Sequence, residues 1–65
     1  MALQQYSRVR VRTERFSNEG VRKGDLGFII EAYPDGAYEV EFCDPQGITV
    51  AQIVATDDDL ESAEE

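Results

Sequence analysis

The chain has 65 residues, with 14 Asp and Glu against six Lys and Arg, no histidine and one cysteine, and its formal net charge is −8. A chain this short folds as one domain, residues 1–65, and its core is too small for an enzyme-sized cleft. Without histidine, Ser–His and Cys–His nucleophilic pairs are excluded. One cysteine excludes an internal disulfide and, with no histidine, a zinc site. We therefore expect no enzyme and no cofactor.

Hydropathy and the single cysteine indicate where in the cell the protein is expected. No apolar run approaches the roughly 20 residues of a membrane span, and Met1–Tyr6 lacks the apolar segment of a signal peptide. We expect a cytoplasmic bacterial protein that does not bind membranes. Cys43 stands beside the turn Asp44-Pro45 without a basic neighbour, so we expect a buried or half-buried structural thiol.

The first predicted element is a strand over Tyr6–Thr13, because apolar and basic residues alternate there with period 2. Alternate residues of a strand face opposite sides, so three guanidinium groups share one face. The segment Glu14–Arg22 contains Ser, Asn and Gly and is predicted to be a loop. The inward positions of the strand are Val9 and Val11, and the outward ones are Arg8, Arg10 and Arg12.

The central stretch predicts a β-hairpin. An apolar run, Leu26–Tyr33, is followed by Pro34-Asp35-Gly36 and by the alternating strand Ala37–Phe42. Proline presets the backbone of a turn, and glycine accepts the positive φ that such a turn requires, so we expect φ > 0 at Gly36. Alternation along the chain predicts a core of Val9, Val11, Leu26, Phe28, Ile30, Tyr38, Val40, Phe42 and Ile48.

The last third predicts a second turn over Cys43–Gly47, a third β-rich run over Ile48–Val54 and one helical turn within Ala55–Leu60. Thr56 is the expected N-cap of that turn. The three consecutive aspartates that follow lack the alternate spacing of a calcium loop, so we expect a solvated helix start and no metal. Glu61–Glu65 is predicted to be a frayed acidic tail.

Several of these motifs together resemble a family of very small bacterial proteins known as a domain of unknown function. The resemblance spans Tyr6–Leu60 and implies an SH3-like barrel without catalysis. It also implies an immunity or antitoxin role, because members are encoded beside toxin-like partners. Relatives close the barrel with an apolar strand after the Leu60 position, which this chain lacks. We therefore expect an all-β, SH3-like barrel that is five-stranded or incompletely closed. The motifs are Val9-Arg10-Val11, Lys23–Gly27, Tyr33–Gly36, Tyr38–Phe42 and Gly47–Thr49.

Charge is distributed unevenly along the chain. All six basic residues lie in Arg8–Lys23, whereas Gly24–Glu65 carries twelve acidic residues and no basic one. An acidic body repels phosphate and steers association toward a basic partner protein. We expect the hairpin acids to supply this steering and Tyr33 to act as an aromatic anchor. The predicted partner-binding residues are Glu31, Tyr33, Asp35, Glu39, Glu41 and Asp44.

Two alternatives remain open at this point. An accessory or structural subunit could form a homo-oligomer and complete its barrel with a neighbour's strand. A nucleic-acid-binding barrel could use the basic strand Arg8–Arg12, although the acidic remainder of the chain disfavours it. Acidity that serves only solubility would leave the partner surface apolar.

Overall fold

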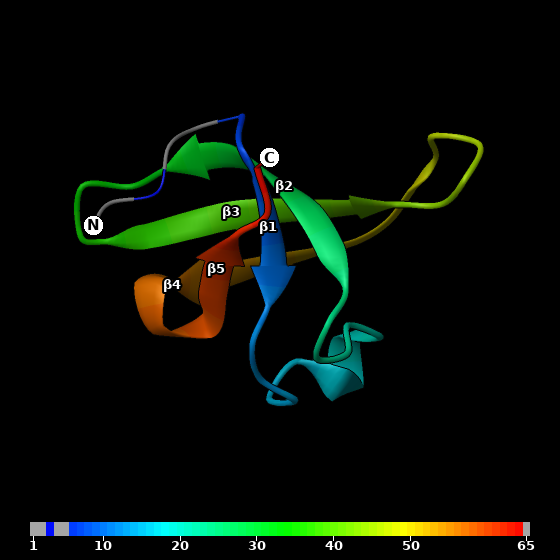
Figure 1. Ribbon diagram of the computed structural model, residues 1–65, viewed down its shortest axis with the longest axis horizontal. Coiled ribbons are helices and arrows are strands. Elements are labelled where there is room, and N and C mark those ends of the chain that lie inside the picture. The colour runs from blue at the N-terminus through cyan, green and yellow to red at the C-terminus, as the bar shows by residue number, and fades with distance from the viewer. Residues whose placement is uncertain (1–2, 4–5, 65) are drawn as a thin grey trace.

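The computed structural model describes Leu3 and residues 6–64, and they form an all-β domain (Figure 1). Five strands and two short 3₁₀ turns follow one another along the chain. They are β1 (Arg8–Val11), η1 (Ser17–Glu19), β2 (Leu26–Ala32), β3 (Ala37–Cys43), β4 (Thr49–Thr56), η2 (Asp57–Asp59) and β5 (Leu60–Ser62). The ends of β1 to β4 each lie within two residues of the predicted bounds, whereas β5 is a strand that the sequence did not predict.

The strands form one antiparallel sheet in the order β4-β3-β2-β1-β5. Strands β4 and β5 are its two edges and do not pair with each other, so the sheet is open. In Figure 1, β1 and β5 run across β3 and β4, and β2 belongs to both halves. The expected all-β, five-stranded, incompletely closed arrangement is confirmed.

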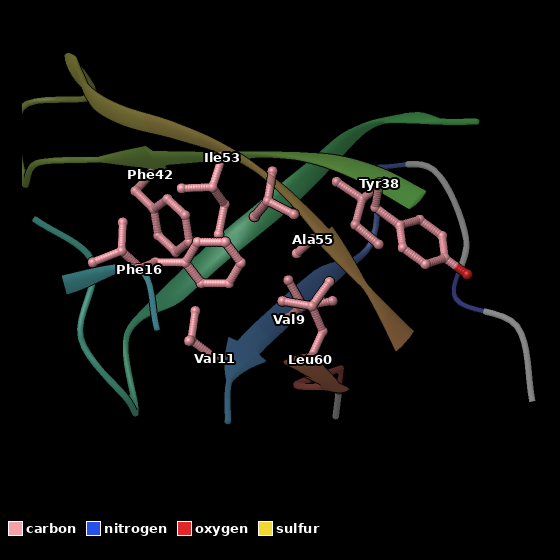
Figure 2. Packing of buried hydrophobic residues seen from close by; sticks show 11 residues of the cluster. Val9, Val11, Phe16, Tyr38, Phe42, Ile53, Ala55 and Leu60 are labelled. Carbon is pink, nitrogen blue, oxygen red and sulfur yellow. The ribbon is translucent and has the colours of Figure 1, made fainter. Parts of the chain in front are cut away.

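The core lies between the two halves of the sheet. Figure 2 shows Phe16, Phe42 and Ile53 in contact range at one end and Tyr38 at the other. Val9, Val11, Tyr38, Val40 and Phe42 are buried, as the alternation predicted. The loop and the later strands add buried residues that were not predicted: Phe16, Val21, Ile29, Ile53, Ala55, Leu60 and Ala63.

Strand β2 presents the opposite face to the one predicted. Leu26 and Phe28 are about half exposed, Ile30 is half-buried, and Gly27 and Ile29 face the core. Gly27 allows this because it lies under the Phe42 ring, where a Cβ atom would come within 2.7 Å of the ring. A shift of one residue exchanges the two faces of a strand. The alternation of large apolar residues in β2 was therefore a misleading guide to the core.

The turns and the C-terminal end agree with the sequence in part. Gly36 has φ +90°, as predicted. Ile48 and Cys43 are exposed, so Ile48 is not core and the thiol is not buried. The acidic end is not frayed through residue 64, because Glu61 belongs to β5 and Ala63 is buried. The expectation for residue 65 falls outside the described residues.

The predicted helical turn is a 3₁₀ turn, η2, with Thr56 as its N-cap. The backbone N–H and the hydroxyl of Thr56 both donate to Asp59 Oδ2, at 3.0 and 3.2 Å. Asp59 is only 6% exposed and forms a salt bridge with Arg15 at 2.6 Å. The solvated helix start predicted here is therefore wrong for Asp59, whose carboxylate joins two distant segments of the chain.

Within the described residues, no helix is long and apolar enough to cross a membrane.

Candidate functional site

The candidate site is the solvent-facing side of β2, β3 and β4, which we call the outer face. It begins with a β-bulge in β2. Ile29 pairs with Val40, but the next pair is Glu31 with Glu39, so Ile30 is an extra residue on β2. Without this bulge the register would place Glu31 opposite the buried Tyr38. The bulge instead turns Glu31 to the outer face, and bulges often re-aim a side chain beside functional sites.

Two glutamates consequently lie directly opposite each other. Glu31 and Glu39 are cross-strand partners, and neither forms a salt bridge within residues 6–64. Like charges in this position repel and destabilise a sheet. Tyr33 lies beside them and its hydroxyl donates to Glu39 Oε1 at 2.8 Å. That hydrogen bond, partial desolvation and the charges of Glu39, Glu31 and Asp35 raise the pKa of Tyr33.

The next row of the outer face mixes acidic, apolar and polar groups. Phe28 is opposite Glu41, and Glu41 is opposite Gln52. Phe28 is 48% exposed although its ring is large and apolar. Glu41 accepts a hydrogen bond from the Thr49 hydroxyl and has no basic partner among the described residues. Carboxylates therefore alternate with apolar surface across this face.

Strand β4 forms the rim of the outer face and an edge of the sheet. Its eight residues, Thr49–Thr56, contain no charge and no proline. Val50 and Val54 are 62% and 54% exposed, while the intervening Ile53 faces the core. An edge strand of this length and composition offers outward N–H and C=O groups with which another strand can pair. The sequence did not predict the apolar part of the site: Phe28 was expected in the core, and Val50 and Val54 were given no role.

An apolar hollow adjoins this rim. It has a volume of about 310 Å³ and is lined in part by Leu26, Cys43 and Val50, with the acidic Glu19 and Asp25 also at its walls. Strand β4 contains a second bulge at Val50, because Phe42 pairs with Ala51 whereas Cys43 pairs with Thr49. The hollow therefore offers room for an apolar side chain next to carboxylates.

The predicted partner-binding residues fall into two groups. Glu31, Tyr33, Glu39 and Glu41 are brought together on the outer face. Asp35 and Asp44 instead support turns: Asp35 Oδ1 accepts from Ala37 N at 3.3 Å. Asp44 Oδ1 accepts from the backbone N–H groups of Gln46 and Ile48 at 2.9 and 3.0 Å. Their carboxylates support the turns at the two ends of β3, and their role in partner binding stays a prediction.

Most basic side chains are engaged elsewhere. Arg10 pairs with Glu61 at 3.2 Å and Arg22 with Glu14 at 2.8 Å. The Arg8 guanidinium donates to the carbonyl of Ala63 at 3.3 and 3.4 Å. The Arg15 guanidinium that pairs with Asp59 also lies 4.2 Å from the centre of the Phe16 ring. The arginine stripe predicted on β1 thus mainly ties β1 to β5.

No group of three or more Cys, Asp and Glu side chains in residues 6–64 is placed to hold a metal ion. Asp59, the buried carboxylate, is committed to Arg15, and hydrogen bonds from this guanidinium outweigh burial and lower the pKa of Asp59. The outer face presents carboxylates beside exposed apolar side chains.

Comparison with known proteins identifies the family but not an activity. The family described as Domain of unknown function (DUF4926) matches residues 6–62, and the chain belongs to this family. No curated protein and no solved structure matches it.

Proposed function

We propose that this protein is a non-enzymatic binding module that holds a basic partner protein against the outer face and the β4 edge. The observation that carries the proposal is the cross-strand pair Glu31 and Glu39 beside an uncharged edge strand. A cation from a partner would remove the repulsion between these carboxylates. A strand from the same partner would satisfy the open backbone groups of β4, the recognition mode known as β-strand addition.

A partner strand beside β4 would lie two strand spacings from β3, about 10 Å from Glu39 and Glu41. Long Lys and Arg side chains can cover much of that distance over the exposed Val54. Apolar partner residues would pack on Val50 and Phe28. We therefore expect the docking segment to be extended, with basic and apolar residues alternating.

A second copy of the chain fits this surface less well. Each copy carries a net charge of −8, and pairing two β4 edges would bring two sets of outer-face carboxylates together. Such repulsion opposes association. The family resemblance suggests a toxin-like partner instead, and we propose an immunity or antitoxin role carried out in the bacterial cytoplasm.

The test uses the full chain as bait for proteins from cells that make it, with three baits compared. The wild type should capture a basic protein, and high salt should release it. Exposed charges are screened beyond about 8 Å at 0.15 M salt, and higher salt shortens this distance further. The double variant Glu31→Gln/Glu39→Gln should lose it. Asp58→Asn/Asp57→Asn makes the same charge change on η2 and should retain it.

The folding of the first variant can be checked separately. The double variant Glu31→Gln/Glu39→Gln lacks the repulsion between the two carboxylates. The free energy of unfolding of this variant should therefore equal that of the wild type or exceed it by about 0.2–1 kcal/mol. Loss of capture without loss of stability would assign the carboxylates to binding. Equal capture by all three baits, or a salt-independent dimer of the chain in light scattering, would contradict the proposal.

A further inference from the structure

A second surface, separate from the outer-face carboxylates, gathers three basic residues, two of which form no salt bridge within residues 6–64. Among the described residues, the charged groups of Arg12 and Lys23 take part in no hydrogen bond and no salt bridge, whereas the other four basic side chains do. Both residues line the same hollow, together with Arg10. In a protein of net charge −8, this concentration of cations calls for an explanation.

The hollow lies between the end of β1 and the turn before β2. It measures about 240 Å³, and its remaining walls are Val11, Gly24 and Glu61. Two backbone hydrogen bonds hold it together: Gly24 N donates to the Val11 carbonyl at 2.8 Å, and Arg12 N donates to the Asp59 carbonyl at 2.8 Å. The backbone that carries these cations is therefore held in place by hydrogen bonds to β1 and to η2.

The charges around the hollow suggest the kind of ligand. Three cations and the carboxylate of Glu61 give the lining side chains a net charge of +2, and Glu14, outside the lining, also attracts Lys23. The nearby Glu14 is paired with Arg22, and the Asp25 carboxylate accepts from the backbone N–H of Arg22 at 2.8 Å. More distant acids are screened beyond about 8 Å at physiological salt. The lining is therefore net positive and suits an anionic ligand.

We propose that this hollow binds a phosphoryl dianion, whether free phosphate or a phosphoryl group carried on a larger molecule. Guanidinium groups present paired donors that match phosphate oxygens, and Lys23 adds a point charge. Arg10 can take part because its pair with Glu61 is exposed, and exposed pairs contribute little stability. The site does not depend on the protein partner proposed above.

An NMR titration of the ¹⁵N-labelled full chain tests the site, with sodium phosphate compared against sodium chloride at equal ionic strength and pH 8. Saturable shifts are expected at the amides around Arg12, Lys23 and Gly24. Arg12→Gln should weaken binding by about tenfold. Glu61→Gln should strengthen it, because it removes the competing carboxylate. Arg8→Gln makes the same charge change on the same strand outside the hollow and should have a much smaller effect.

Two further probes distinguish the source of the phosphoryl group. AMP binding more tightly than phosphate would indicate a nucleotide, and O-phosphoserine binding more tightly would indicate a phosphorylated side chain. Equal affinity would indicate free phosphate. Shifts that follow ionic strength alone, equal weakening by Arg12→Gln and Arg8→Gln, or acetate binding as tightly as phosphate would overturn the proposal.

Discussion

The two edges of the sheet are built in opposite ways. Strand β5 has three residues and is bound on its inner side to β1, where Arg10 pairs with Glu61 and the Ala63 N–H donates to the Arg8 carbonyl at 2.9 Å. The Arg8 backbone N–H in turn donates to Glu64 Oε2 at 2.6 Å. Charged groups and a short length are the usual means of protecting an edge.

Strand β4 has neither protection. It is eight residues long, has no charge and exposes Val50 and Val54. Its bulge at Val50 lies near its start, and Ala51–Thr56 stays in regular register with β3. The β5 edge is therefore protected by polar contacts, whereas the β4 edge can still pair with another strand. The contrast shows that the sheet is protected at only one of its two edges, and a net charge of −8 opposes pairing of the other edge with a second copy of the chain.

The largest expected effect is at Gly27 in β2, the strand that joins the two halves. A Cβ atom in Gly27→Ala would lie 2.7 Å from Phe42 Cε1 and 2.9 Å from the Glu41 carbonyl. Overpacking of this kind should lower the free energy of unfolding by about 2–3 kcal/mol. Chemical denaturation measures it. The double variant with Phe42→Leu should show positive coupling, and purely additive losses would contradict the proposed contact.

The protein should be destabilised when the contacts just before the β5 edge are removed. Asp59→Asn removes the salt bridge to Arg15 and the charged acceptor for Thr56 just before β5. Loss of these charged hydrogen bonds should lower stability by about 1.5–3 kcal/mol. Asp58→Asn, on the same turn and exposed, is the matched control and should change stability by less than about 0.5 kcal/mol.

The same contact makes a pH-dependent prediction. The pKa of Asp59 lies below its ordinary value of 3.8 in the folded state. Its stabilising contribution is therefore complete above that value and is lost as the pH falls through the lowered pKa. The stability difference between wild type and Asp59→Asn should shrink from about pH 5 downward. A difference that stays constant to pH 2 would show that the ion pair does not stabilise the fold.

The hairpin that presents the outer-face carboxylates depends on its turn. Gly36 has φ +90° with open space around its Cβ position, so a side chain there is strained by the backbone alone. We expect Gly36→Val to lower stability by about 1–2 kcal/mol. Gly36→Asn should lower it by less, because asparagine tolerates this region. Equal losses would point to a cause other than backbone conformation.

The smallest expected effect on stability is at the open edge. Val54→Lys places an ammonium group opposite Glu39, and opposite charges in such a pair contribute about 0.2–1 kcal/mol. Stability should be unchanged or slightly raised, whereas capture of the basic partner should fall. Gln46→Lys, which adds the same charge at an exposed position outside β4, is the control. A variant that still captures the partner would show that β4 is not the docking edge.

The sequence alone was sufficient for the local structure. Proline, aspartate and glycine at 34–36 require a turn with a positive φ, and the period-2 pattern of β3 places Tyr38, Val40 and Phe42 in the core. Thr56 could be identified as an N-cap from the residues that follow it. These features depend on near neighbours in the chain. Four of the predicted partner-binding residues lie together on the outer face because one hairpin carries them; their role in binding stays a prediction.

Only the tertiary structure decided which face each strand presents and where the edges lie. The bulge at Ile30 and the close packing of Gly27 under Phe42 reversed the inside and outside of β2. The acidic end became strand β5 because Arg10 and Arg8, about 50 residues away, provide its partners. Pairing between distant segments leaves no local periodic signal in the sequence. The open edge at β4 and the cation-lined hollow could therefore be identified only from the tertiary structure.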